Sequence, residues 1–179
     1  MQIQKRLGFI GKSTIVQKLN NNTIVFKFVA TTPPQNPLRL KVEINCREHL
    51  CIFGHIKVPR TVQSSWFNGN AELMTYSLEE LLGSKMRALY QRRKGRDLYD
   101  LWYAIAHKHI DIEKLLEAYH KFMEYLPQPP TKKMYLANIA AKMNDDEFLR
   151  DMNILVKPGF EFNIIQAYEK VKESVLEKL

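Results

Sequence analysis

The segment Ser77–Tyr103, SLEELLGSKMRALYQRRKGRDLYDLWY, most strongly constrains how this chain can fold, because it predicts two helices joined by a tight basic turn at Lys94–Gly95. Ser77 and Glu80 have the spacing of a capping box, in which the serine hydroxyl accepts the backbone N–H of residue 80 and the glutamate accepts that of residue 77. Apolar side chains then recur at helical spacing and predict one stripe: Leu78, Leu81, Leu82, Met86 and Leu89.

Lys85 lies inside this stripe, one helical turn from Leu81 and from Leu89. An isolated ammonium is costly to bury, so it normally has a carboxylate partner. Asp97 and Asp100 are three positions apart and therefore share one face of the second helix. We predict that the Lys85 ammonium lies in a partly buried cleft, close to at least one of these two acids.

The two acids also have a purely structural interpretation. Asp97, near a helix start, would be stabilised by the helix dipole and would pair with Arg93 or Arg96 across the turn. From the residues alone, the R-D-x-x-D pattern is as typical of a brace at a helix start as of a catalytic set, and both interpretations stay open.

The net charge of +8 is concentrated around the turn, where six basic residues lie between positions 85 and 96: Lys85, Arg87, Arg92, Arg93, Lys94 and Arg96. One interpretation is a solvated turn, and the other is a surface for the phosphates of a nucleotide or an RNA. Composition is that of a soluble globular protein, with 45% apolar and 26% charged residues.

Several features indicate a cytoplasmic protein without a membrane partner. No apolar run approaches the length of a membrane span, and Met1–Ile10 lacks the apolar core of a signal peptide. Cys46 and Cys51 are not in C-x-x-C spacing, and we expect both to be reduced thiols.

Before Ser77 the patterns favour strands, at 14–19, 23–30, 38–46, 50–58 and 71–76. Asn20-Asn21-Asn22 predicts a hairpin loop of about three residues, and 59–70 predicts a loop whose Trp66-Phe67 pair covers other residues. After Tyr103 the patterns favour helices, at 112–125, 131–143, 145–156 and 160–179. We therefore predict an α+β fold, with a small, mostly antiparallel sheet in residues 1–76 and a helical domain in residues 77–179.

The segment EELLGSKMRALYQRRKGRDLYDLW resembles the K-x-x-A-L…R-x-x-x-R-D-x-x-D-L signature of the AbiEii/AbiGii family, the nucleotidyltransferase toxins of type IV toxin–antitoxin systems. The similarity extends from LKVEIN, before the signature, through the helical tail. It implies that residues 1–76 form part of a nucleotidyltransferase core.

The resemblance also implies roles for particular residues. Lys85, Arg93 and Arg96 would contact nucleotide phosphates, as their charge allows. Asp97 and Asp100 would position Lys85 or a metal, or help to activate the acceptor hydroxyl.

Glu43, in K-V-E-I-N, would be the third Mg²⁺-holding carboxylate and would face the Lys85 region, although a solvent-facing glutamate on a one-sided sheet explains it equally from the residues.

The sequence departs from the family pattern in one respect, since it contains neither the glycine-rich G-G-[ST] motif nor the D-x-D pair. The chain therefore resembles a family member without its first catalytic segment. Because Mg²⁺ is held by several carboxylates together with substrate phosphates, we expect the chain to be inactive by itself. We also expect it to self-associate through an uncovered sheet edge or to require a partner.

Two functions follow from these observations. The first is a toxin that transfers a nucleotide from a nucleoside triphosphate to RNA, such as tRNA, beside a cognate antitoxin. The second is a non-catalytic truncated relative that binds a nucleotide, an RNA or a protein.

Overall fold

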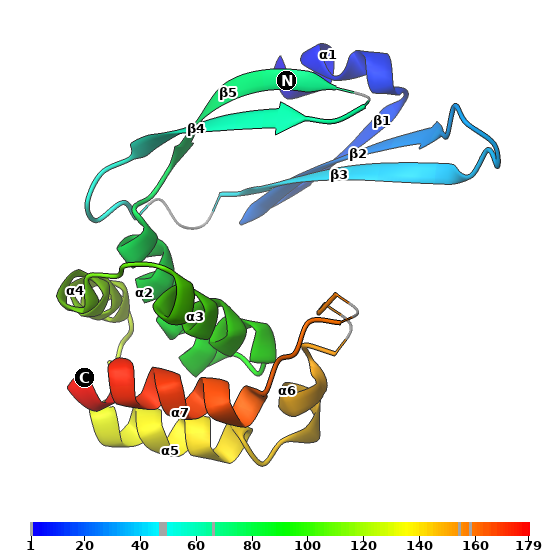
Figure 1. Cartoon of the computed structure of the whole chain (residues 1–179). Helices are drawn as coiled ribbons and strands as arrows, with labels where there is room; N and C mark the ends of the chain where they lie inside the picture. The colour runs from blue at the N-terminus through cyan, green and yellow to red at the C-terminus, as the bar shows by residue number, and fades with distance from the viewer. Residues whose placement is uncertain (1, 47–49, 66, 154, 158) are drawn as a thin grey trace. The chain divides into compact units, whose positions relative to one another are not determined.

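The computed structural model describes residues 2–46, 50–65, 67–153, 155–157 and 159–179 and contains two compact units, Met1–Leu50 and Cys51–Leu179 (Figure 1). Two small antiparallel sheets precede most of the helices, so the predicted α+β class is confirmed. The strands form two separate sheets rather than one. The functional division into residues 1–76 and 77–179 stays a prediction.

The first unit begins with the short helices α1 (Gln2–Arg6) and η1 (Gly8–Ile10) and continues with a three-stranded sheet of order β1-β2-β3. Its strands are β1 (Ser13–Lys18), β2 (Asn21–Val29) and β3 (Pro37–Asn45). Ile24 and Phe26 of β2 are fully buried and lie opposite Val42 and Leu40 of β3. The alternation predicted for β3 therefore places its apolar side chains beside those of β2.

The predicted three-residue loop between β1 and β2 is wrong. Lys18 pairs directly with Asn21, so the turn consists of Leu19 and Asn20, and Asn22 belongs to β2. The expectation rested on the tolerance of asparagine for positive φ. No described residue other than glycine has a positive φ, so this turn does not use that property.

The second sheet is a two-stranded ribbon of β4 (Ile56–Gln63) and β5 (Asn68–Thr75). The strand predicted at 50–58 begins later than expected, and the loop predicted at 59–70 is mostly strand. Pro59 misled the prediction, because proline ends a central strand but is tolerated at an edge, and both strands of a two-stranded ribbon are edges. Trp66 lies outside the described residues, and the exposed Phe67 ring lies against Gly69.

Among the described residues of the second unit, seven helical segments follow β5, and the core of the unit lies between them. Helix α2 (Leu78–Gln91) packs against α3 (Gly95–His107) and α4 (Ile112–Met123), and α3 packs against α7 (Ile164–Ser174). The other segments are α5 (Lys132–Lys142), α6 (Asp146–Arg150) and η2 (Leu176–Lys178). None of the helices in the described ranges is long and apolar enough to cross a membrane.

The helix starts follow from capping side chains. Asp111, Thr131 and Asp145 each accept a backbone N–H at the start of α4, α5 and α6. Two helices are shorter than predicted. Asn163 caps α7 only at Ile164, and α6 ends at Arg150. Leu155 lies in the predicted helix at 145–156 but beyond the end of α6, and it is exposed.

The capping box predicted at the start of α2 is half correct. The Ser77 hydroxyl accepts the N–H of Glu80 at 3.2 Å, as expected. The Glu80 carboxylate does not close the box. It is buried and accepts the backbone N–H groups of Ile52 at 2.7 Å and Phe53 at 3.0 Å. Glu80 therefore attaches the segment before β4 to the first turn of α2, because a buried carboxylate needs such donors.

Candidate functional site at helices α2 and α3

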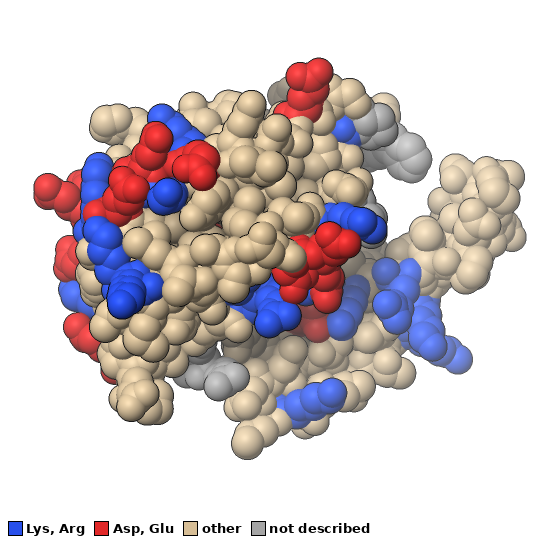
Figure 2. Space-filling view, turned by 90° about the horizontal axis from the view of Figure 1, so that it is seen from below, with Lys and Arg blue, Asp and Glu red and all other residues tan. Residues whose placement is uncertain are grey.

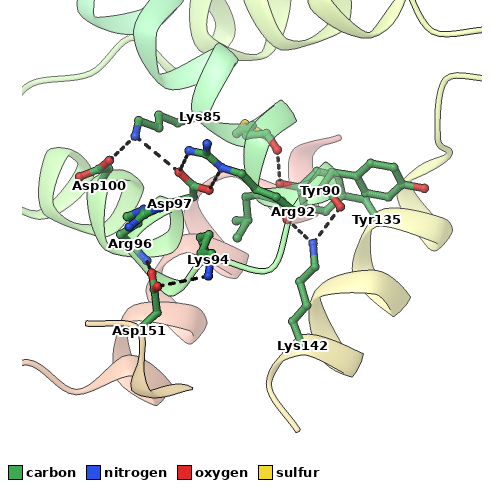
Figure 3. A network of polar contacts seen from close by, with 12 residues as sticks. Lys85, Tyr90, Arg92, Lys94, Arg96, Asp97, Asp100, Tyr135, Lys142 and Asp151 are labelled. Atoms are coloured by element: carbon green, nitrogen blue, oxygen red, sulfur yellow. Dashed lines mark hydrogen bonds and ion pairs between the residues drawn. The ribbon is translucent and has the colours of Figure 1, made fainter. Parts of the chain in front are cut away.

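Lys85 of α2 lies between the two acids of α3, as predicted (Figure 3). Its ammonium is 2.6 Å from an Asp100 carboxylate oxygen and 3.5 Å from an Asp97 oxygen. The Lys85 side chain is 35% exposed and that of Asp100 is 41% exposed, whereas Asp97 is fully buried. The predicted geometry is confirmed, and the Lys85–Asp100 pair is accessible to solvent while its support is not.

Asp97 is held by an arginine that the site prediction did not include. Arg92 donates from Nε to Asp97 Oδ2 and from its terminal nitrogen to Oδ1, both at 2.6 Å. This is the two-pronged geometry in which guanidinium and carboxylate match best. Hydrogen bonding to Asp97 raises the pKa of Arg92 above its ordinary value. Arg92 therefore fixes Asp97, which was expected to pair with Arg93 or Arg96.

Three other basic residues of the turn contact helix α6 or one of the two residues that flank it. Arg93 pairs with Asp145 at 3.1 Å, and Lys94 pairs with Glu147 at 2.8 Å. The backbone N–H of Arg96 donates to Asp151 at 3.1 Å. Figure 2 shows that basic and acidic side chains also lie next to each other on one face of the molecule, where Lys and Arg are directly beside Asp and Glu at several places. Most of the basic cluster is thus neutralised by nearby acids.

Lys142 of α5 secures the other end of α2. Its ammonium is buried and donates to the backbone carbonyls of Leu89 and, at 2.8 Å, Tyr90, while the Tyr135 hydroxyl donates to that of Met86 at 2.9 Å. The last carbonyls of a helix have no partner within the helix, so these donors complete α2 and hold it in place. Lys85 is therefore carried by a helix that is fixed at both ends.

Lys142 gives the chain a pH-dependent term in its stability. Burial, and next the charge of Arg93, lower the pKa of Lys142 from 10.5 to about 8. Between these two values the unfolded chain binds more protons than the folded chain, so the free energy of unfolding rises with pH there. A single titrating group can contribute a rise of at most about 1.4 kcal/mol per pH unit.

Lys142→Met removes this titration. We expect urea unfolding, followed by circular dichroism between pH 8 and 10.5, to show a larger rise in stability for the wild type than for the variant. Other lysines and the tyrosines titrate in both proteins, so only the difference between the two curves reports on Lys142. Parallel curves would contradict the assignment.

Glu43 lies in the first unit, on β3. Lys41 Nζ is 2.7 Å from its carboxylate, and both side chains are about half exposed. The hydrogen bond and charge of Lys41 lower the pKa of the Glu43 carboxyl. This ion pair places Lys41 and Glu43 on one face of the strand, as the alternation predicts. The position of Glu43 relative to Lys85, and its role as a metal ligand, stay predictions.

The acids of α3 do not fit a magnesium ion as they stand. Both Asp97 oxygens accept from Arg92, and Asp100 is paired with Lys85. Among the described residues, no group of three or more His, Cys, Asp or Glu side chains is placed to hold a metal. Nucleotidyl transfer generally uses Mg²⁺ bound to carboxylates and to substrate phosphates.

A comparison with models of protein families identifies the family to which this chain belongs. The model of the family "Nucleotidyl transferase AbiEii toxin, Type IV TA system" matches residues 3–173. The chain belongs to the AbiEii family. It is therefore a member of a family of nucleotidyltransferase toxins whose systems pair a toxin with an antitoxin. No curated protein and no solved structure matches the chain.

The AbiEii assignment explains why the K-x-x-A-L and R-x-x-x-R-D-x-x-D-L patterns occur together, since the fold brings Lys85 against Asp97 and Asp100. The site prediction missed Arg92, although this residue is the first arginine of the second pattern. Its position five residues before Asp97, at the end of α2, was the available signal. Nothing local indicated Lys142, because its partners are far away in the sequence.

Proposed function

We propose that this AbiEii chain binds a nucleoside triphosphate through Lys85 and takes part in the transfer of a nucleotide to an RNA acceptor such as tRNA. The observation that carries the proposal is the half-exposed ammonium of Lys85, held by two acids between two packed helices. A positioned cation of this kind suits the negative charge of a triphosphate, and phosphoryl transfer depends chiefly on positioning and charge stabilisation.

Each acid has a separate role in this proposal. Asp97 is a positioning residue, since its carboxylate is buried and directs Arg92 and Lys85. Asp100 is accessible and takes the proton of the acceptor hydroxyl. The hydroxyl oxygen then bonds to the α-phosphorus, and pyrophosphate leaves. Arg96 contributes a second positive charge, whereas Arg93, paired with Asp145, contributes mainly after release from that acid.

The proposal also includes Mg²⁺ and a cognate antitoxin as partners of the chain. The acids that hold Mg²⁺ would not come from α3, because Asp97 and Asp100 are occupied by cations. We propose that this chain by itself binds a nucleotide without transferring it. The alternative function is a binding module without catalysis, which the pairing of both α3 acids with cations favours.

Lys85→Ala tests the phosphate contact. We expect it to weaken nucleoside triphosphate binding about 10- to 100-fold in calorimetric titration, the range of a lost charge-assisted contact. Folding should change little, because Arg92 still neutralises Asp97. Lys94→Ala is the matched control, since it removes the same charge from a lysine paired with Glu147. Equal affinities for the two variants would reject Lys85 as the phosphate contact.

A transfer assay tests whether this chain is a complete enzyme by itself. The purified chain is incubated with Mg²⁺, each labelled nucleoside triphosphate and total tRNA. We expect nucleotide binding without transfer of label. Robust transfer that Lys85→Ala abolishes would show instead that the chain is a complete enzyme, and the binding-module alternative would be rejected.

A further inference from the structure

An open pocket of about 710 Å³ lies beside the Lys85–Asp100 pair, and Arg96 and Asp100 are the only lining residues that the proposed function uses. One wall is the outer face of α3, which contributes Arg96, Tyr99, Asp100 and Tyr103. The rest of the lining comes from the segment after α6 and includes Lys157 and Phe160. Because Asp100 belongs to both places, a ligand in this pocket lies next to the proposed site of transfer.

The pocket has an aromatic lining. The Tyr99 and Tyr103 rings are nearly parallel, with centroids 5.8 Å apart, and the Phe160 ring meets Tyr99 edge-on at 6.3 Å. Tyr103 and Phe160 are each about 40% exposed. Exposed aromatic rings that do not complete a core provide apolar surface of the kind on which nucleic acid bases stack.

The cations of the pocket differ from the rest of the basic cluster. Arg92, Arg93 and Lys94 are paired with carboxylates. Among the described residues, neither the Arg96 guanidinium nor the Lys157 ammonium has a hydrogen bond or an ion pair, and both line the pocket. Two cations without an ion-pair partner, in the lining of an aromatic pocket, are complementary to a phosphate attached to a base.

We propose that this pocket binds the single-stranded end of the RNA acceptor, with a base against Tyr99, Tyr103 and Phe160 and the backbone phosphates at Arg96 and Lys157. The inference rests on the proposed function, since it assigns the acceptor to a place beside Asp100. Single-stranded nucleic acid is bound in this way when bases are splayed onto aromatic rings beside a positively charged groove.

The extent of the aromatic surface favours an RNA strand over a free nucleotide. The row of rings continues along α3 beyond the pocket, where Tyr103 stacks on His107 with centroids 4.4 Å apart and planes 9° apart. Both side chains are exposed. A surface longer than one base suits successive nucleotides of a strand, whereas a mononucleotide would use only the pocket.

The test measures binding of a short fluorescein-labelled oligoadenylate by anisotropy. We expect Tyr103→Ala to weaken binding about 5- to 100-fold, the range for loss of one stacked base. Arg96→Ala should weaken binding and lower the dependence of log affinity on log salt by about 0.7, as expected for one lost phosphate contact on a single strand. Tyr103→Phe keeps the ring and should bind like the wild type.

Matched controls lie outside the pocket. Tyr125→Ala removes an exposed tyrosine, and Arg150→Ala removes an exposed arginine paired with Asp146. Oligoadenylate binding that is absent, or unchanged in Tyr103→Ala and Arg96→Ala, would overturn the inference. So would a loss of ATP binding in Tyr103→Ala with RNA binding intact, because the pocket would then hold the mononucleotide. None of these three results changes the outcome of the Lys85→Ala test of the proposed function.

Discussion

Asp97→Ala should lower the free energy of unfolding by about 3 kcal/mol, the low end of the range for breaking a buried ion pair. The carboxylate is fully buried and accepts two 2.6 Å hydrogen bonds from Arg92. Its removal leaves Arg92 and Lys85 without the carboxylate that both of them contact. The low end applies because the Arg92 side chain is half exposed and can turn toward water.

Urea unfolding at neutral pH measures this loss. Asp146→Ala is the control, since Asp146 is 81% exposed and its i,i+4 pair with Arg150 should contribute less than about 0.5 kcal/mol. A loss in Asp97→Ala no larger than that of the control would show that the buried pair does not stabilise the helical unit. Asp97→Asn keeps the shape of the side chain, and it should still weaken the contacts with both cations.

The structural and catalytic interpretations of the R-D-x-x-D pattern apply to different residues. Asp97 has the properties of a brace, because it is inaccessible and saturated with hydrogen bonds. Asp100 and Lys85 are accessible. Among the described residues, Asp100 is paired only with Lys85, and Lys85 is paired with Asp100 and Asp97. The buried brace fixes the accessible pair, so a single motif can hold the fold together and present charged groups to a ligand.

Local patterns were sufficient to predict much of the fold. Ser77, Asp111 and Thr131 are capping residues whose helices begin where the sequence predicts. The contacts of Lys85 with Asp97 and Asp100 could also be predicted, because helical spacing fixes which helix faces carry the lysine and the two acids. Such features depend on residues a few positions apart, and a sequence displays them directly.

The errors at the β1–β2 turn and at Pro59 were local, whereas others concern groups whose partners are distant in the chain. Glu80 accepts from Ile52 and Phe53, and Lys142 donates to Leu89 and Tyr90. No local pattern identifies these partners, since a buried charge only requires that some donor or acceptor be present. Arg92 is a near neighbour of Asp97, but three arginines lie within five residues of this acid, and spacing alone does not select one of them.

Gly95→Ala should be the second strongly destabilising change, with a loss of about 2 kcal/mol or more in the free energy of unfolding. Gly95 is the first residue of α3 and is buried. A Cβ atom there would lie 2.4 Å from the backbone carbonyl oxygen of Phe148 in α6 and 3.5 Å from Ile164 Cδ1. The obstacle is backbone, which cannot rotate away, so α6 or the start of α3 must move.

Gly8→Ala is the matched control, because a Cβ atom at Gly8 would meet nothing within 4 Å and should change stability little. Alanine is a better helix former than glycine by about 1 kcal/mol, so Gly95→Ala would be stabilising if space were available. The sign of its effect therefore distinguishes close packing of α3 on α6 from a loose turn.

Because Asp97 is two residues further along α3, a shift of this helix start should also weaken the contacts of Asp97 with Arg92 and Lys85. We therefore expect Gly95→Ala to weaken nucleoside triphosphate binding, whereas binding equal to that of Gly8→Ala would show that the start of α3 does not position the site.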